Sequence, residues 1–229
     1  MLSLRIEDLA KSFPGLGGPV LEIASLTIAP GSRVAVTGGS GSGKSTFVNL
    51  ITGLERATSG KLVWNGDDIS RVSEAARDRW RARHVGLVMQ DFHLFPGLSA
   101  FENILLPARL ARVADAVTIG RARELLATVG LLRPDQRIET MSRGEMQRVA
   151  IARALLRKPG VIVADEPTAS LDAEAGEAVG RLLLDLAEQA GTTLIVVSHD
   201  QRLINRLDRR LTFQAGRIVS DSVSDEVAA

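Results

Sequence analysis

The chain has 229 residues, a formal net charge of +1 and no cysteine. This length accommodates one large α/β domain or two smaller lobes, and the near-zero charge excludes recruitment to nucleic acid or acidic lipid by charge alone. Without cysteine, disulfides, thiolate metal sites and thiol nucleophiles are excluded as well.

Two further observations concern nucleic acid and membranes. Aromatic residues make up 3% of the chain, too few for a surface on which single-stranded nucleic acid would stack. The first ten residues include Arg5, Glu7 and Asp8, which argues against a secretory signal, and no apolar run reaches the roughly 18 residues that cross a bilayer. We therefore expect a soluble protein that reaches a membrane only through a partner.

The N-terminal part of the chain is predicted to consist mainly of strands. Apolar residues in alternating or continuous runs predict them at residues 2–6, 20–28, 33–37, 60–64 and 85–89. A tight turn is predicted at Asn65-Gly66, and helices at 47–52 and 73–83. The second helix carries arginines at positions 77, 79, 81 and 83. This basic run fits either a solvated face or a surface for a partner.

The C-terminal part begins with a change of character at residue 91. Helices predicted at 101–111, with Pro107 inside, and at 119–129 form a helical insertion, and another helix is predicted at 142–157. The remaining predicted elements are a strand at 161–164, a helix at 174–189, a strand at 193–198 and a hairpin of 211–214 with 217–219. Strands alternating with helices imply a mostly parallel sheet. The polar tail, 220–229, is expected to fray.

One glycine-rich stretch follows the strand at 33–37 and leads into the helix at 47–52. It reads Gly38-Gly39-Ser40-Gly41-Ser42-Gly43-Lys44-Ser45-Thr46. Strand, glycine-rich turn and helix form the context in which this spacing binds nucleotide phosphates, because successive backbone N–H groups and the helix N-terminus point at one anion. We expect Lys44 to reach the β- and γ-phosphates and Ser45 to bind Mg²⁺. A flexible linker, the alternative, requires neither the Lys-Ser-Thr ending nor the preceding strand.

Polar residues follow three other predicted strands. Asp165 and Glu166 come directly after the strand at 161–164, Gln90 ends the strand at 85–89, and His199 follows the strand at 193–198. Asp165 would bind Mg²⁺, which requires hard oxygen ligands, and Glu166 would act as the general base toward water. Gln90 would reach the metal or the water, and His199 the γ-phosphate. The alternative for Asp165 and Glu166 is a pair of solvated acids at the start of a helix. The alternative for His199 is a structural role.

These motifs together resemble those of the ATP-binding subunits of ABC transporters. Residues 141–148 are similar to the family's signature segment (conventionally Leu-Ser-Gly-Gly-Gln), 165–168 to the Walker B region and 169–172 to the D-loop. Gln90 matches the Q-loop, His199 the switch histidine and Phe13 the adenine-stacking aromatic. The resemblance covers residues 2–220. It implies a single nucleotide-binding domain over 1–229, a P-loop α/β fold with a mostly parallel core sheet, an antiparallel β subdomain and a helical subdomain at about 91–157.

The resemblance also implies a mechanism. Each ATP would lie between residues 38–46 of one subunit and the signature and D-loop of a second subunit, a copy or a paralogue. The contacts from that second subunit would come from Ser142, Gly144, Glu145 and Asp172. Two residues depart from the family pattern. Arg143 replaces the first signature glycine, which puts the dimer affinity in doubt, and Phe13 replaces the commoner tyrosine but keeps the ring.

Within the family, residues 83–90, 101–107 and 164–168 resemble the lipoprotein-release and macrolide-export group. That group implies a four-helix membrane partner with a large extracytoplasmic domain, and an ATPase held by this partner at the cytoplasmic face of the inner membrane. The apolar cluster at 92–106 would either receive the partner's coupling helix or form the core of its own lobe. An importer ATPase of another ABC branch is the alternative within the family.

The alternative from a different class of protein is a soluble ABC-type ATPase that acts on DNA or ribosomes. Only about a hundred residues separate Lys44 from Ser142, which leaves no room for the long coiled coil of the DNA-acting members. The chain has one cassette and near-neutral charge, so no nucleic-acid partner is expected. A cassette that binds ATP without hydrolysing it is disfavoured by the presence of Glu166 and His199.

Overall fold

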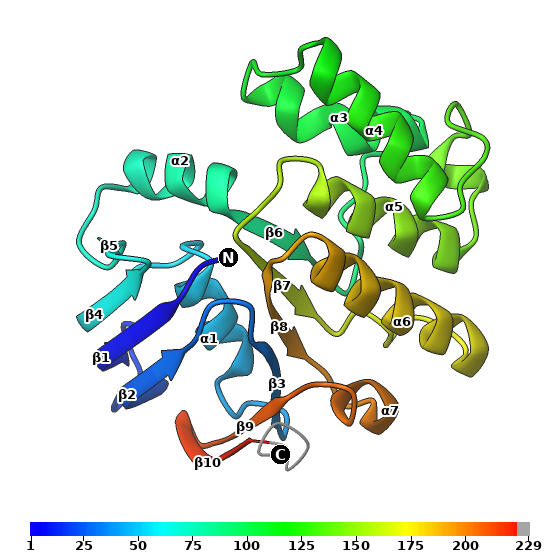
Figure 1. Cartoon of the computed structure of the whole chain (residues 1–229). Coiled ribbons are helices and arrows are strands. Elements are labelled where there is room, and N and C mark those ends of the chain that lie inside the picture. The colour runs from blue at the N-terminus through cyan, green and yellow to red at the C-terminus, as the bar shows by residue number, and fades with distance from the viewer. Residues whose placement is uncertain (224–229) are drawn as a thin grey trace.

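The computed structural model describes residues 1–223, which form two sheets and two groups of helices (Figure 1). The larger sheet has the strand order β10-β9-β3-β8-β7-β6 and the smaller one the order β2-β1-β4-β5. In the larger sheet, strands β9, β3, β8, β7 and β6 run parallel and only β10 is antiparallel. The predicted mostly parallel core sheet and antiparallel β subdomain are therefore confirmed.

The strands of the larger sheet are β3 (Arg33–Gly38), β6 (Val85–Val88), β7 (Val161–Asp165), β8 (Thr193–Val197), β9 (Arg209–Gln214) and β10 (Arg217–Val223). In β7, every residue except Asp165 is buried, as expected of a parallel strand covered on both faces. Because side chains alternate along a strand, its residues divide between two cores. Val161 and Val163 pack on the side of α1, and Ile162 and Ala164 on the side of α5 and α6.

One core lies between the two sheets around helix α1 (Lys44–Ile51), whose Phe47, Val48, Leu50 and Ile51 are buried. The small sheet that closes this core consists of β1 (Leu4–Lys11), β2 (Leu21–Ile28), β4 (Ser59–Trp64) and β5 (Asp67–Asp68). Strand β1 continues beyond the predicted end at residue 6. A β-bulge shifts its register between Glu7 and Ala10, so the buried Leu9 falls three positions after the buried Ile6 and breaks the alternation.

The other core lies under the helices that follow β6. These are α3 (Ala100–Leu110), α4 (Ala116–Thr128), the short η1 (Ile138–Thr140), α5 (Arg143–Leu155) and α6 (Ala173–Gln189). Side chains cap four of their N-termini: Ser99 for α3, Asp115 for α4, Ser142 for α5 and Asp172 for α6. These caps satisfy backbone N–H groups that a helix leaves unpaired, which fixes where each helix begins. The predicted helical insertion is confirmed, and α3 continues through Pro107.

The basic helix α2 (Glu74–His84) fits neither of the two predicted interpretations fully. Arg77 is only 7% exposed, and its Nε donates to the carbonyl oxygen of Gly53 at 3.0 Å. Arg81 donates to the same oxygen at 2.7 Å. Two of the four arginines therefore hold the chain that leaves α1, while Arg79 and Arg83 are exposed.

Several other predicted elements differ from the structure. The first helix begins at Lys44, inside the glycine-rich stretch, rather than at residue 47. The predicted fraying from residue 220 is wrong for residues 220–223, which pair with β9 as part of β10; residues 224–229 lie outside the described part of the chain. A short helix, α7 (Gln201–Ile204), was not predicted. Among the described residues, no helix combines the length and apolar character needed to span a bilayer.

Candidate active site

Four loops that carry predicted site residues leave the same edge of the large sheet. Strands β3, β8, β7 and β6 are consecutive and parallel, so their carboxyl ends lie together. The glycine-rich loop follows β3, His199 follows β8, Asp165 ends β7 and Gln90 follows β6. This edge is where open parallel sheets bind ligands. The fold therefore gathers Lys44, Asp165, Glu166, Gln90 and His199 at one place.

The glycine-rich loop has a backbone that other residues would not allow. Gly38 has a φ of +144°, and a Cβ there would lie 2.3 Å from the carbonyl oxygen of Phe213. Gly43 has a φ of +101° and is the N-cap of α1. The loop is also packed against its neighbours, because the N–H of Gly216 donates to the carbonyl of Ser42 at 3.0 Å. A narrow cradle results in front of the N-terminus of α1, where an anion is favoured.

Lys44 is folded back over this cradle. Its Nζ donates to the carbonyl oxygens of Gly38 at 2.7 Å and of Gly39 at 2.9 Å. The Oγ of Ser42 is buried and has no hydrogen-bond partner among the described residues. The cradle thus contains an ammonium group that is bonded to neutral carbonyls and that phosphate oxygens would attract.

Phe13 lies in the loop between β1 and β2. The ends of that loop are joined by a hydrogen bond from the N–H of Val20 to the carbonyl of Lys11, at 2.7 Å. Val20 also borders Gly43, since its carbonyl oxygen would be 3.4 Å from a Cβ there. The end of the Phe13 loop is therefore next to the phosphate cradle, and adenine stacking by Phe13 stays a prediction. The Nζ of Lys11 lies 4.6 Å from the centre of the Phe13 ring, a cation–π contact that sequence reasoning missed.

Asp165 is the acidic end of strand β7. Burial raises the pKa of its carboxyl group, and the positive charge of Lys44 acts in the opposite direction. Its partners for Mg²⁺ would be Ser45, exposed in the first turn of α1, and Gln90. Among the described residues, no three acids, histidines or cysteines gather as a metal site. This sparse set of oxygen ligands fits Mg²⁺, which takes its remaining ligands from water and substrate phosphates.

Glu166 has a left-handed backbone, with a φ of +47°, which is rare for a residue that is not glycine. Its N–H donates to the carbonyl of Val197 at 2.8 Å, and this bond holds the turn. The carboxylate Oε1 lies 3.3 Å from Nε2 of His199, and Oε2 accepts the N–H of His199 at 3.4 Å. Burial raises the pKa of Glu166, while His199 lowers it. Such backbone strain is concentrated at functional sites.

Gln90 completes this part of the site. It lines a cavity of about 620 Å³ together with Glu166 and His199. The turn that follows it is strained, with a φ of +59° at Phe92 and +44° at His93. Arg153 of α5 holds this turn, donating to the carbonyls of Phe92 at 2.7 Å and His93 at 2.6 Å. Sequence reasoning missed Arg153, because an arginine on a helix gives no sign of which distant carbonyl it reaches.

The signature residues lie at the start of helix α5. The Oγ of Ser142 accepts the N–H of Glu145 at 3.3 Å, and the Glu145 carboxylate accepts the N–H and the Oγ–H of Ser142 at 2.8 and 2.9 Å. These hydrogen bonds hold the pKa of Glu145 below its usual range. Predicted as a nucleotide contact, Glu145 is engaged here in a capping box. The guanidinium of Arg143 lies 5.8 Å from the centre of the Phe92 ring.

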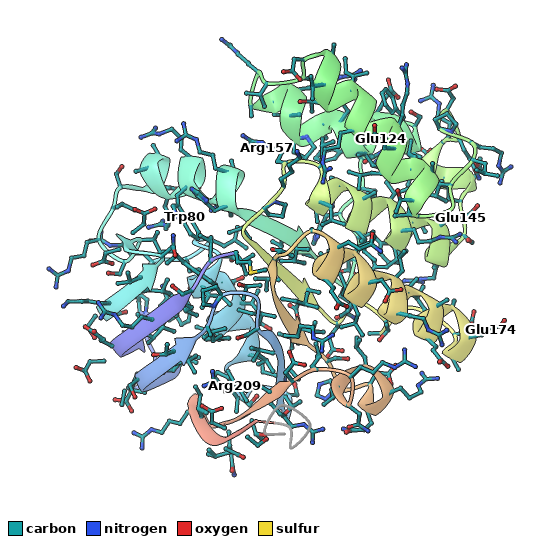
Figure 2. The ribbon with its side chains drawn as sticks, viewed as in Figure 1. Trp80, Glu124, Glu145, Arg157, Glu174 and Arg209 are labelled. Atoms are coloured by element: carbon teal, nitrogen blue, oxygen red, sulfur yellow. The ribbon has the colours of Figure 1, made fainter. Side chains whose placement is uncertain are left out.

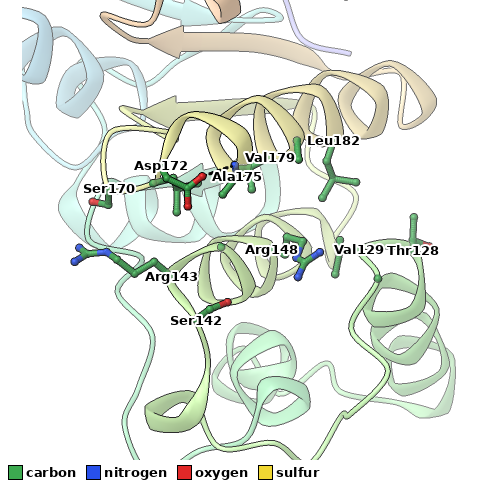
Figure 3. Close-up of a pocket in the computed structure, with 14 residues that line it drawn as sticks. Thr128, Val129, Ser142, Arg143, Arg148, Ser170, Asp172, Ala175, Val179 and Leu182 are labelled. Carbon is green, nitrogen blue, oxygen red and sulfur yellow. Dashed lines mark hydrogen bonds between the residues drawn. The ribbon is translucent and has the colours of Figure 1, made fainter.

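Ser142 and Asp172 form a group apart from the cradle. Figure 2 shows Glu145 and Glu174, from the first turns of α5 and α6, on the same side of the molecule. Ser142, Gly144 and Asp172 line one cavity, of about 640 Å³, in which no residue of the glycine-rich stretch takes part (Figure 3). Within one chain, the two predicted halves of the nucleotide site are therefore separate.

Comparison with known proteins agrees with this geometry. The family model described as ABC transporter matches residues 21–169. The chain belongs to the ABC transporter family. The structure is similar to one described as the dimeric structure of a post-hydrolysis state of the ATP-binding cassette MJ0796 bound to ADP and Pi, with a TM-score of 0.86, 32% identity, and coverage of 96% of this chain and 98% of that one.

Curated relatives of this ABC protein cover nearly its whole length. The lipoprotein-releasing system ATP-binding protein LolD of Nitratidesulfovibrio vulgaris is 42% identical over 217 residues, 93% of each chain. An uncharacterized ABC transporter ATP-binding protein of Mycobacterium tuberculosis is 42% identical over 201 residues, 87% of this chain and 81% of the relative. The protein is thus an ABC-type ATPase, the ATP-binding subunit of a transporter, and the predicted family, fold and enzyme class are confirmed.

Proposed function

We propose that this ABC ATPase works as a dimer that holds ATP between two copies and drives a separate membrane partner in lipoprotein or lipid release. The proposed dimer is inferred from one observation: within one chain, Lys44 lies apart from Ser142 and Asp172. A γ-phosphate presents more oxygens than one cradle satisfies. The N-terminus of α5 in a second copy supplies further N–H donors and a positive helix end.

Each half of the site has its own task. Residues 38–46 and Phe13 of one copy bind the triphosphate and adenine, with Lys44 moving from the carbonyls of Gly38 and Gly39 to the phosphates. Ser142, Gly144 and Asp172 of the other copy close over the γ-phosphate. To donate its Oγ–H there, Ser142 must release the Glu145 carboxylate that now accepts it. Dimer closure is therefore coupled to the loss of this one hydrogen bond, while the two backbone N–H bonds of the capping box can remain.

The metal of this site is proposed to be Mg²⁺, held by Ser45, Asp165 and Gln90. When bound, it neutralises charge on the phosphates. Glu166 takes the proton of the attacking water, and its raised pKa makes its carboxylate a better base than an exposed one. The contact between Oε1 and Nε2 of His199 orients that carboxylate. Release of phosphate removes the shared ligand, and the dimer opens.

The lipoprotein-release assignment within the family rests on the relatives named LolD, at about 40% identity over most of the chain. The partner is proposed to be a four-helix membrane protein with a large extracytoplasmic domain, which would hold this ATPase at the cytoplasmic face of the inner membrane. Of the apolar cluster at 92–106, Phe92, Ile104 and Leu105 are buried in the chain's own core. Phe95 is 52% exposed, which makes it the member of the cluster available to that partner.

The experiment is a pull-down of tagged Glu166→Gln protein from detergent-solubilised membranes with ATP and Mg²⁺, with partners identified by mass spectrometry. Lys44→Ala protein is the control, because it lacks the phosphate ligand but keeps the outer surface. We expect a four-helix protein with a large extracytoplasmic domain, enriched with the first variant over the second. A partner with six or more spans would replace the lipoprotein-release assignment with another ABC branch. Recovery of soluble DNA- or ribosome-associated proteins alone would overturn the transport assignment.

A further inference from the structure

Lys11 contacts the ring of Phe13 from two residues earlier, at the end of strand β1. Its Nζ lies over one face of the ring, 4.6 Å from the ring centre. Phe13 itself is partly buried, and among the described residues it packs into neither of the two hydrophobic cores. Core packing therefore does not fix the position of this ring.

The backbone around Phe13 holds its loop at few points. At the start of the loop, the N–H of Ser12 donates to Oγ1 of Thr58 at 3.0 Å. Inside it, the N–H of Leu16 donates to the carbonyl of Phe13 at 3.3 Å. Residues 14–19 are exposed, and three of the six are glycines. Because such a loop has many accessible conformations, a side-chain contact is needed to keep the ring in one position.

Lys11 is in turn anchored to the segment that leaves helix α1. Its Nζ donates to the carbonyl oxygen of Arg56 at 3.0 Å and lies 3.2 Å from Oε2 of Glu55. The side chains of Lys11 and Glu55 are 15% and 29% exposed, so solvent screens this ion pair less than one on an open surface. The N–H of Glu55 donates to the carbonyl of Asn49, in α1, at 3.0 Å. One ammonium group thus connects the ring to helix α1.

Helix α1 also carries the phosphate cradle, at its other end. The helix has eight residues and begins with Lys44, so it rises about 12 Å from the cradle to the segment that Lys11 contacts. The base and the phosphates of a nucleotide are joined by a ribose and must be bound at a matching separation. Through Lys11, the ring is held relative to the same rigid helix that presents the cradle.

We propose that Lys11 is a positioning residue for nucleotide binding, which holds the Phe13 ring in place so that a base stacks on the face opposite the ammonium group. This inference rests on the proposed function, in which Phe13 contacts adenine. Lys11 itself does not touch the nucleotide. A ring that is already held does not have to be immobilised when the base binds, and immobilising one side chain lowers affinity by a factor of about two to ten.

The test compares two ligands on the full chain by titration calorimetry with Mg²⁺: ATP, and inorganic tripolyphosphate, which lacks the base. Because both ligands carry three phosphates, the ratio of their affinities cancels most of the general effect of losing a positive charge. Lys11→Met removes the ammonium group and keeps an unbranched side chain. The ratio of ATP affinity to tripolyphosphate affinity should fall about fivefold in this variant.

Two other lysine variants complete the comparison. Lys11→Arg keeps a cation that stacks on aromatic rings and pairs with carboxylates, so the ratio should return to within about twofold of the unaltered protein. Lys61→Met is the matched control, because Lys61 is also paired with a glutamate of the small sheet, Glu7, at 3.4 Å. It should leave the ratio unchanged. A ratio that falls equally in Lys11→Met and Lys61→Met would overturn the proposal.

Phe13→Ala separates this proposal from the proposed function. It should lower the ratio at least as far as Lys11→Met, and the double variant should lower it no further, because without the ring Lys11 has nothing to position. If Phe13→Ala leaves the ratio unchanged, the adenine contact fails and the Lys11 proposal falls with it. If Phe13→Ala lowers the ratio and Lys11→Met does not, only the Lys11 proposal is overturned.

A purely structural role of Lys11 gives a different result. Lys11→Met would then weaken ATP and tripolyphosphate equally, because the link to the end of α1 would support the cradle rather than the ring, and the proposal would be overturned. Unfolding curves establish that each variant is folded. If Lys11→Met is not, Glu55→Gln takes its place, since it removes the charge beside the ammonium group and should lower the ratio about twofold. An unchanged ratio in that variant would also overturn the proposal.

Discussion

The Oε1 atom of Glu166 lies 3.3 Å from Nε2 of His199, and Oε2 accepts the backbone N–H of the same histidine at 3.4 Å. The two residues follow neighbouring strands, β7 and β8, so the sheet itself sets their distance. Glu166 is largely buried and His199 is mostly exposed, with side-chain exposures of 16% and 62%. The carboxylate is thus fixed in direction while the imidazole stays open to a ligand.

Glu166→Gln should lower the rate of ATP hydrolysis by at least about a hundredfold, the usual contribution of a general base. ATP affinity should remain within about twofold, because the amide keeps the size of the side chain and the phosphate cradle is on another strand. Phosphate release and equilibrium nucleotide binding measure the two quantities. An unchanged hydrolysis rate would remove Glu166 as the base.

His199→Gln should move the acidic limb of the pH–rate profile to higher pH. Burial raises the pKa of Glu166 above its ordinary value, and His199 counteracts that rise. Without the histidine, the pKa of Glu166 rises further, and a larger fraction of the base is protonated at a given acidic pH. Since only the carboxylate accepts a proton, activity is then lost at a higher pH on acidification. A limb that stays in place or moves to lower pH would contradict this relation.

Lys44→Ala should weaken ATP binding by at least a hundredfold, about 2.7 kcal/mol. The variant removes an ammonium group that lies over the cradle and now bonds only to the carbonyls of Gly38 and Gly39. Lys61→Ala, on the exposed face of β4, serves as a control for the loss of one positive charge. Titration calorimetry with ATP and Mg²⁺ measures both. Equal affinities in the two variants would show that the cradle does not hold the phosphates.

Arg77→Ala should destabilise the fold by about 2 kcal/mol, since it removes a buried side chain and one of the two donors to the Gly53 carbonyl. Arg79→Ala, at an exposed position on the same helix, should change stability by less than about 0.5 kcal/mol. Urea unfolding of the two variants gives the comparison. If both variants lose less than about 0.5 kcal/mol of unfolding free energy, the arginines of α2 form only a solvated face, which is one of the two interpretations predicted from the sequence.

Much of the site could be predicted because its spacing and context are local. A glycine-rich turn between a strand and a helix, and acids directly after a buried strand, are patterns that the chain displays without any tertiary information. Once the sheet is parallel, Gln90, Asp165 and His199 must meet at one edge. The family resemblance adds the roles of these residues, and the order of the motifs makes that resemblance specific.

What could not be predicted depends on partners far apart in the chain. Arg77 and Arg153 act on carbonyls 24 and 61 residues away, and a basic residue on a helix gives no indication of such a target. The end of β1 was missed because its bulge breaks the alternation on which strand prediction relies. The capping box of Ser142 and Glu145 follows a local pattern, [ST]-x-x-[DE], but the same residues resemble the family's signature, and that resemblance predicts nucleotide contacts rather than a helix cap.

The central claim is that ATP is held between two copies, by the cradle of one and the signature of the other. Light scattering tests this claim by measuring the molar mass of Glu166→Gln protein in solution, where one chain has a mass of about 24.5 kDa. We predict about twice that mass with ATP and Mg²⁺ and the mass of one chain without them. Adding Ser142→Trp should restore the mass of one chain with ATP present while leaving ATP binding intact. A mass that ATP does not change, or a dimer that Ser142→Trp does not disturb, would contradict the account.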